Sequence, residues 1–124
     1  MTMQYEIDKD ANVTYITFAG TIDDQILISQ MGKVVGDPQF GLNTSMLHDY
    51  RRVTEFQVTP LGMNAVQEMM IHLKGFEASR KLALVAPNTL ARRLAWMCHG
   101  LHAESPEDVA IFQNMAEARR WLTL

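Results

Sequence analysis

Ser45-Met46-Leu47-His48-Asp49-Tyr50 is the stretch around which the rest of the chain can be arranged. This mostly apolar run ends in a carboxylate and an aromatic ring, and its length and composition predict a buried strand. The polar passage 51–58 follows it, and Thr59-Pro60 then begins a helix. A strand that leads through a loop to a helix N-terminus often forms a binding site in α/β proteins. We therefore expect the functional site at the end of this strand.

The helix after the polar passage is predicted to start at Thr59, because a threonine hydroxyl at the N-cap can accept a backbone N–H. Pro60 suits the first helical position, and Gly75 is expected to end the helix after about Lys74. We expect its core-facing stripe to consist of Leu61, Ala65, Met69 and Leu73.

The apolar surface of this helix is broader than one stripe, because Met63, Met70 and Ile71 extend it around the cylinder. A helix that packs on a sheet buries a stripe of roughly 100° or somewhat more. We therefore predict that these three side chains are not all covered by the core of their own chain. The excess surface would contact a partner chain or the passage 53–58, and unbranched methionine suits such an adaptable contact.

Two short segments before the opening stretch predict an antiparallel hairpin. Residues 4–8 and 13–19 alternate apolar and polar side chains, and a turn at 10–12 separates them. Gly20 is expected to end the second strand, and Thr21 is expected to begin a helix. The core face of that helix is predicted to consist of Leu27, Ile28, Met31, Val34 and Val35.

The remaining chain alternates strands and helices. The nearly continuous apolar run 81–86 predicts a strand covered on both faces, and a helix is expected over 88–102. Residues 109–112 form the last predicted strand. Asn114 and Glu117 then make a capping box for a final helix.

The predicted order of elements is β-β-α-β-α-β-α-β-α, in which right-handed crossovers place helices on both faces of the sheet. We predict an α/β fold with a single compact domain over residues 1–124. Its mixed, mostly parallel sheet would have about five strands, an N-terminal antiparallel hairpin and four flanking helices. The strand 45–50 is expected to be central and parallel to the second strand.

Composition excludes several classes of protein. The chain has 124 residues, of which 48% are hydrophobic and 20% charged, as is ordinary for a soluble globular protein. A net charge of −3 gives no electrostatic reason to expect nucleic acid as a partner. No run approaches the roughly 18 apolar residues of a membrane span. The single cysteine, Cys98, cannot form an internal disulfide, so we expect a cytoplasmic protein.

No group of residues predicts catalysis, a cofactor or a metal site. His48 and Asp49 are neighbours in a strand, so their side chains should point to opposite faces and not form an acid–base pair. Cys98, His99 and His102 are residue types that bind metals. However, Cys98 should face the core side of its helix, and no second ligand pair occurs at zinc spacing. We therefore expect a protein that is not an enzyme.

Two helix N-termini, after Thr59 and after Asn88, are predicted to lie at the carboxyl ends of parallel strands. Their unpaired backbone N–H groups would receive an anion or the polar head of a ligand near Asp49, Tyr50 and Arg51. Asp49 can itself accept loop N–H groups or pair with Arg51 or Arg52.

Trp96 lies off the leucine stripe of the predicted helix 88–102. Arg92, four residues earlier, can stack on its ring through a cation–π contact. A tryptophan outside the core stripe covers a local site or anchors an interface, so we assign Arg92 and Trp96 to the binding surface. The alternative is that the helix bends at Gly100 and Trp96 packs inside.

Several segments, in the same order and spacing over nearly the whole chain, resemble a known family. They are Phe18-Ala19-Gly20-Thr21-Ile22, Leu47-His48-Asp49-Tyr50-Arg51, Lys81-Leu82-Ala83-Leu84-Val85-Ala86, and Ile111-Phe112 followed by Glu117-Ala118-Arg119-Arg120-Trp121-Leu122. Their succession resembles the SpoIIAA-like family, relatives of the STAS and anti-sigma-factor-antagonist fold. Similar members are small bacterial cytoplasmic proteins that are not established enzymes, and the fold is also similar to that of Sec14-type lipid carriers.

The best-known branch of that fold is switched by phosphorylation of a serine at the start of the helix after the central strand. By position, the resemblance makes Thr59 a possible phosphorylation switch. The passage Val58-Thr59-Pro60-Leu61 departs from the family's Asp-Ser-Ser-Gly type of sequence. A plain helix cap is therefore the other interpretation of Thr59.

The resemblance implies a non-enzymatic regulatory or interaction module that binds a protein partner or forms a homodimer. The alternative is a carrier or sensor of a small apolar, lipid-like ligand, held between the helices 60–74 and 89–102.

Overall fold

The computed structural model describes residues 3–41, 44–71, 81–87, 89–90, 93 and 108–123, and for Met70, Ile71 and Asp108 it describes the backbone alone. In chain order the elements are β1 (Met3–Asp8), β2 (Val13–Asp23), α1 (Asp24–Val35), β3 (Ser45–Gln57), α2 (Pro60–Ile71), β4 (Lys81–Val85), β5 (Asp108–Phe112) and α4 (Met115–Leu122). This part of the chain contains three helices instead of the four expected. The predicted helix 88–102 lies mostly outside the described residues.

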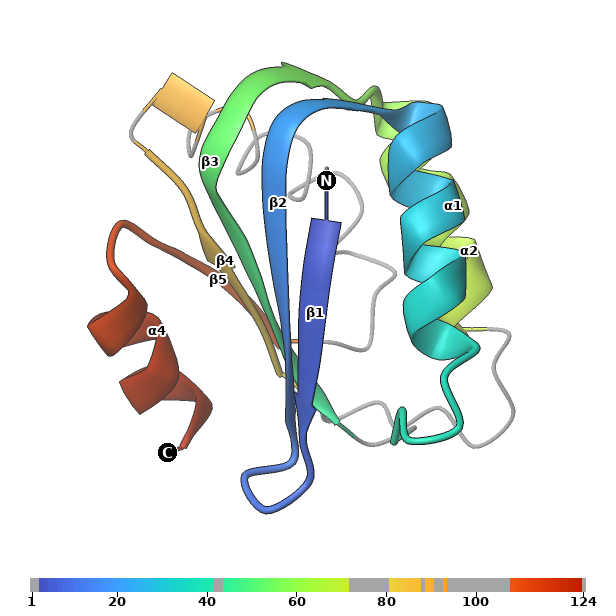
Figure 1. Cartoon of the computed structure of the whole chain (residues 1–124). Helices are drawn as coiled ribbons and strands as arrows, with labels where there is room; N and C mark the ends of the chain where they lie inside the picture. Colours follow the sequence, from blue (N-terminus) through green and yellow to red (C-terminus); the bar gives the residue numbers. More distant parts are fainter. Residues whose placement is uncertain are drawn as a thin grey trace.

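The five strands form one mixed sheet in the order β1-β2-β3-β4-β5. β1 and β2 are antiparallel, and every other neighbouring pair is parallel. The N-terminal hairpin, the mostly parallel sheet and the central position of β3 are therefore confirmed. In Figure 1, α1 and α2 lie side by side on one face of the sheet, and α4 lies on the other face.

β2 and β3 continue well past the points at which the sequence predicted them to end. Gly20 lies inside β2, and the passage 51–57, which we expected to be a loop, belongs to β3. The pairing register between the two strands shifts twice, each time with an extra residue on β3, and such bulges bend a strand. Gly20 has a φ of +75°, a conformation that glycine adopts without steric strain. As a result, the β2–β3 ribbon arches over the helices α1 and α2 (Figure 1).

The start of α1 also differs from the prediction. The N-cap is Asp23, whose carboxylate accepts the backbone N–H of Ile26 at 2.8 Å, and not Thr21. Thr21 and Ile22 remain in β2, where Ile22 is completely buried. The strand continues because burying Ile22 favours the extended conformation, and an aspartate caps a helix as well as a threonine does.

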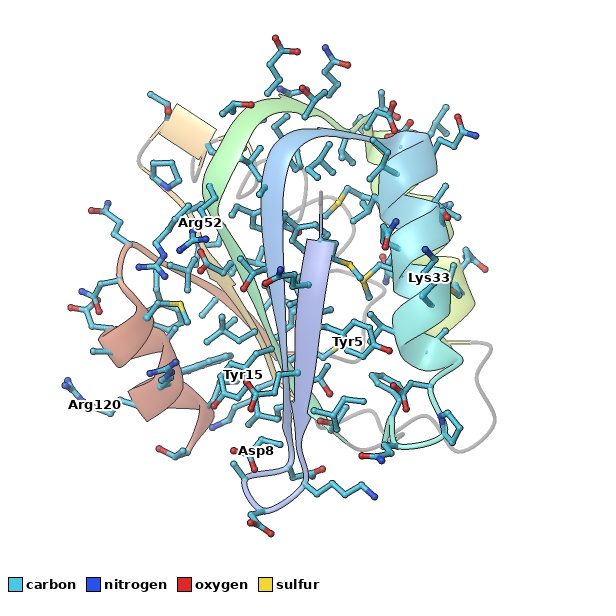
Figure 2. The ribbon with its side chains drawn as sticks, in the orientation of Figure 1. Tyr5, Asp8, Tyr15, Lys33, Arg52 and Arg120 are labelled. Carbon is cyan, nitrogen blue, oxygen red and sulfur yellow. The ribbon has the colours of Figure 1, made fainter. Side chains whose placement is uncertain are left out.

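Apolar side chains fill both faces of the sheet. On the α1 and α2 face, the buried cluster contains Met3, Ile16, Phe18, Ile22, Leu27, Met31, Val34, Phe40, Met46, Tyr50, Phe56, Val58, Leu84 and Ala86. On the α4 face, it contains Val13, Leu47, Ala83, Val85, Ala118 and Leu122. Figure 2 shows the resulting alternation along the hairpin, with Tyr5 on the α1 side and Tyr15 on the α4 side.

α4 follows its prediction closely. The side chain of Asn114 accepts the backbone N–H of Glu117 at 2.8 Å, which confirms Asn114 as the N-cap. Ala118 and Leu122 are buried against the sheet, and Met115 packs beside them.

The inward face of α2 is rotated relative to the predicted stripe. Leu61, which we placed in the core, is 81% exposed. Its neighbour Gly62 is buried, and Met63, Val66 and Met69 pack against the larger cluster. The rotation follows from the contact between Gly62 and α1, because this contact turns the preceding side chain toward solvent.

Asp24, at the start of α1, joins the N-termini of α1 and α2. Its Oδ1 accepts the backbone N–H of Thr59 at 2.7 Å, and its Oδ2 accepts the Thr59 hydroxyl hydrogen. Gly62 lies so close that a Cβ atom added to it would overlap the Asp24 carboxylate. The glycine at position 62 thus leaves room for the Asp24 carboxylate to stay in contact with Thr59.

This contact predicts that Gly62→Ala destabilises the protein by about 1 kcal/mol, because the added methyl group displaces Asp24 from Thr59. The matched control is Gly32→Ala in α1, where an added Cβ meets no atom within 4 Å. In that open helical position alanine should stabilise the protein by several tenths of a kcal/mol. Urea unfolding measures both changes. The Gly62→Ala cost should also fall in an Asp24→Ala background, and an equal cost in both backgrounds would contradict the proposed contact.

Candidate functional site

Where the pairing of β3 with β4 ends, β3 carries an ion pair between a buried carboxylate, Asp49, and a half-exposed arginine, Arg51. Asp49 is 4% exposed, and its two carboxylate oxygens accept the Nε and Nη2 groups of Arg51 at 2.9 Å each. The Arg51 backbone N–H also donates to Asp49 Oδ1 at 3.0 Å. Burial raises the pKa of Asp49, but the hydrogen bonds and charge of Arg51 outweigh it and hold that pKa below its ordinary value. Of the two arginines expected as partners of Asp49, the structure shows Arg51, which also donates its backbone N–H.

His48 and Tyr50 lie on the opposite face of the sheet, inside the core. The Tyr50 ring is 1% exposed and stacks on Phe18, with ring centroids 4.9 Å apart. His48 Nδ1 lies 3.2 Å from the Tyr50 hydroxyl, and Nε2 has no hydrogen-bond partner in the described part of the chain. Asp49 and His48 thus face different layers, as the alternation of the strand predicted, and do not form an acid–base pair.

Burial lowers the pKa of His48 to about 4. A positive charge there would lie among aromatic rings, at 5.7 Å from Phe18 and 6.1 Å from Tyr50 between ring centroids. The neutral imidazole is therefore the form that fits the fold at neutral pH.

We had expected Thr59 to lie near Asp49, Tyr50 and Arg51, but the structure does not bring them together. The second half of β3 separates Thr59 from those residues. Thr59 does cap α2, since its hydroxyl accepts the Gly62 N–H at 3.3 Å. The N-terminus of α2 is also occupied by a carboxylate of the same chain, that of Asp24.

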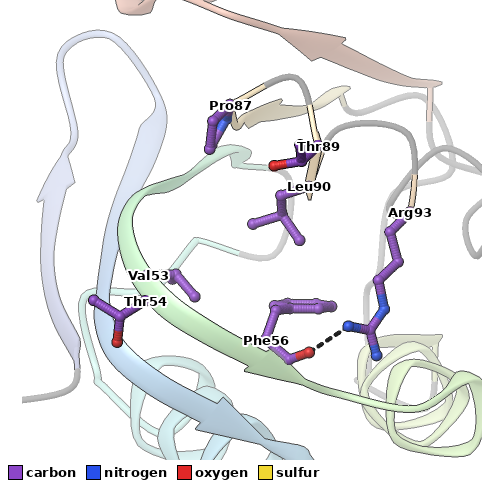
Figure 3. Close-up of a pocket in the computed structure, with 7 residues that line it drawn as sticks. All are labelled: Val53, Thr54, Phe56, Pro87, Thr89, Leu90 and Arg93. Atoms are coloured by element: carbon purple, nitrogen blue, oxygen red, sulfur yellow. Dashed lines mark hydrogen bonds between the residues drawn. The ribbon is translucent and has the colours of Figure 1, made fainter.

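A pocket of about 270 Å³ lies at the carboxyl end of the sheet, between the far half of β3 and the chain that follows β4 (Figure 3). Its lining residues are Val53, Thr54, Phe56, Pro87, Thr89, Leu90 and Arg93. Val53 and Leu90 are partly buried and pack against the larger core cluster, of which Phe56 is a member. The pocket therefore combines an apolar wall with two hydroxyl groups and one cation.

Arg93 is held in place at the edge of this pocket. Its Nη1 donates to the carbonyl oxygen of Phe56, as Figure 3 shows, and its Nη2 donates to that of Val58 at 3.4 Å. The guanidinium carbon lies 5.3 Å from the centroid of the Phe56 ring, within cation–π range. Arg93 thus connects the pocket to the segment that leads into α2.

Several predicted site residues fall outside what the structure describes. Met63 is partly buried against the core, whereas the side chains of Met70 and Ile71 lie outside the description. The predicted binding residues Arg92 and Trp96, and the weighed metal ligands Cys98, His99 and His102, lie outside the described residues. Among the residues that are described, no group of three His, Cys, Asp or Glu side chains could hold a metal ion. None of the described helices is long and apolar enough to cross a membrane.

Asp24 and the residues of the pocket were not foreseen as site residues. Val53, Phe56 and Val58 in the passage 51–58 are β-branched or aromatic, and this signal could have identified a strand. The pairing of Asp24 with Thr59 joins residues 35 positions apart, and no local pattern predicts such a contact.

Comparison with solved structures supports the fold. A crystal structure of an uncharacterized protein of the DUF3478 family from Shewanella loihica PV-4, which has a SpoIIAA-like fold, matches the chain with a TM-score of 0.62. The match covers 97% of this chain and 91% of that chain at 16% sequence identity. The protein has a SpoIIAA-like fold. No family model and no curated protein matches the chain, so its SpoIIAA-like character rests on the structure.

The buried His48 predicts a loss of stability in mild acid. The pKa of His48 is about 4 in the folded chain and 6.5 in its ordinary state, so the unfolded chain binds the proton more strongly. The stabilisation is complete above pH 6.5 and decreases by about 3 kcal/mol as the pH falls to 4. Urea unfolding midpoints at several pH values measure this decrease.

His48→Leu is the comparison variant, because it removes the titrating group and keeps an apolar side chain of similar size. Its stability should change much less between pH 6.5 and 4. Asp49, with its lowered pKa, loses its contribution only below about pH 4 and does not obscure this window. A wild-type protein with constant stability over the same range would contradict the burial of a neutral His48.

Proposed function

We propose that this SpoIIAA-like protein is a non-enzymatic interaction module that binds a protein partner, or a second copy of itself, through the N-terminal end of α2. The observation that carries the proposal is the exposure of Leu61, which is 81% accessible to solvent. Among the described residues, the other exposed large apolar side chain is Tyr5, at 37%, and its hydroxyl donates to Asp37.

A single exposed leucine is common on protein surfaces, but Leu61 is presented on a firmly held backbone. Asp24 bonds to Thr59, two residues before it, and buried Gly62 follows it. An apolar side chain on such a rigid helix end can enter a partner's pocket with little loss of backbone entropy. This arrangement supports binding through Leu61.

The site chemistry supports a role without catalysis. The acid in the sheet, Asp49, is paired with Arg51, and His48 is buried on the other face. The lining of the pocket offers hydroxyl groups and one guanidinium, and these do not include a general base.

This proposal predicts that Leu61→Ser weakens association by about tenfold or more, which corresponds to roughly 1.4 kcal/mol of binding free energy. The melting temperature should stay nearly unchanged, because the leucine lies in water in the monomer. Sedimentation over a dilution series measures self-association. For a different partner, photo-crosslinking from position 61 in cells measures the contact.

The control is position 33, where Lys33 is exposed near the other end of α1 (Figure 2). Lys33→Ser should leave self-association unchanged, and a crosslinker at position 33 should give weaker adducts than one at position 61. The proposal is wrong if the protein stays monomeric and position 61 yields no more adduct than position 33.

The pocket favours a second candidate function, the carriage or sensing of a small apolar ligand. We had expected this ligand between the helices 60–74 and 89–102. The pocket that the described residues form is instead bounded by β3 and by Pro87, Thr89, Leu90 and Arg93. Its wall of Val53, Phe56 and Leu90 is suited to an apolar body.

Benzyl alcohol is a neutral probe small enough to enter this pocket. If the pocket is a ligand site, titration should shift the NMR amide signals of Val53, Thr54 and Phe56 in a saturable manner. Shifts confined to other regions, or no saturable shift, would contradict the second candidate.

A further inference from the structure

We propose that this pocket receives a small monoanion, a carboxylate attached to a short apolar or aromatic body, with Arg93 binding the carboxylate and Phe56 supporting the body. The inference rests on the second candidate function, a ligand site in this pocket, and names the chemical class of its ligand. It does not depend on whether Leu61 binds a protein.

Arg93 is exposed, and none of the described carboxylates neutralises its charge. A guanidinium has five N–H donors, and the two bonds described here go to the carbonyl oxygens of Phe56 and Val58. Carbonyl oxygens orient the guanidinium but do not cancel its charge. In the described part of the chain the one salt bridge joins Arg51 to Asp49, so no described carboxylate pairs with Arg93.

The residues that line the pocket leave Arg93 free of a competing acid. The seven lining residues contain no Asp or Glu. The nearest acid along β3 is Glu55, which is exposed and accepts a hydrogen bond from Gln57 at 3.1 Å. A ligand carboxylate would therefore meet the Arg93 cation without a competing acid among the lining residues.

The charge of Arg93 lies beside the apolar wall of the pocket. The Arg93 guanidinium lies over the Phe56 ring, whose residue is 8% exposed. Figure 3 shows Leu90 and Phe56 projecting into the space that Arg93 borders. A flat ligand can lie against Phe56 and Leu90 while its acid group reaches the guanidinium, whose planar donors match a carboxylate.

The size of the pocket restricts the ligand further. Its volume of about 270 Å³ is slightly below the roughly 300 Å³ at which pockets for drug-sized molecules begin. A lipid with two acyl chains is too large for it. An aromatic acid or a short-chain fatty acid fits the volume and the charge together.

The test compares three probes of similar shape, namely benzoate, benzyl alcohol and benzylamine, titrated into the full chain at neutral pH. NMR amide shifts at Val53, Thr54 and Phe56 report the dissociation constants. Benzoate should bind at least about tenfold more tightly than benzyl alcohol, and benzylamine should bind most weakly, because Arg93 attracts the anion and repels the cation.

Two sets of variants assign the effect to the pocket. Arg93→Gln should bring the affinities for benzoate and benzyl alcohol close together, whereas Arg93→Lys should retain part of the difference. A general disturbance of the fold would weaken both probes equally and leave their ratio unchanged. Thr89→Trp, which fills the pocket from an exposed position, should abolish binding of all probes, and Ser29→Trp on the exposed face of α1 should not.

Equal affinities for benzoate and benzyl alcohol in the unmodified protein would overturn the inference and leave the apolar-ligand function in place. An unchanged ratio in Arg93→Gln would also overturn it. The failure of all three probes to bind would overturn both the inference and the second candidate function. None of these results bears on the association measured with Leu61→Ser.

Discussion

The parallel pairing of β2 with β3 beyond the end of β4 is the constraint on which the other features of this protein depend. β4 accompanies β3 only as far as Asp49, whereas β2 remains paired with β3 up to Gln57. Because β3 contains extra residues relative to β2, the two-stranded ribbon bends and delivers both chains to the same side of the sheet. α1 and α2 therefore begin next to each other, and the pocket forms where the bent part of β3 faces the chain leaving β4.

Two neighbouring helix N-termini carry unpaired N–H groups and partial positive charges of the same sign, so their proximity needs a compensating anion. Asp24 provides this anion from within the first turn of α1 and bonds to Thr59 at the start of α2. Because position 62 is a glycine, the Asp24 carboxylate has room beside the start of α2. The same carboxylate occupies the helix end at which we had expected an external anion, and the Gly62 contact turns Leu61 outward.

The polar residues in the middle of β3 stabilise the fold, so binding groups are to be sought elsewhere on the surface. Asp49 is neutralised by Arg51, and His48 is kept neutral by burial. The surfaces that remain for recognition lie at the end of the ribbon, where Arg93 bonds to the carbonyl oxygens of Phe56 and Val58. Arg93 therefore lies between the pocket and the segment that leads to Leu61. The bent part of β3 lines the pocket and also leads into the helix end that presents Leu61, so both candidate functions depend on it.

The sequence by itself determined the elements whose signals are local. The alternation in the hairpin, the apolar run of β4, the Asn114 cap and the opposite orientations of His48 and Asp49 follow from strand and helix periodicity, and the structure confirms them. Val53, Phe56 and Val58 carried a local signal for the extension of β3, but tertiary structure decided how far β2 and β3 stay paired, because that pairing depends on burying Ile22 and Phe56. Tertiary structure also decided which face of α2 is inward. The apolar residues of α2 spread around the helix, so the sequence permits more than one inward face, and the contact of Gly62 with Asp24 selects the observed one. Arg93 became a site residue for the same reason: its partners lie 35 and 37 residues away, beyond the reach of any sequence pattern.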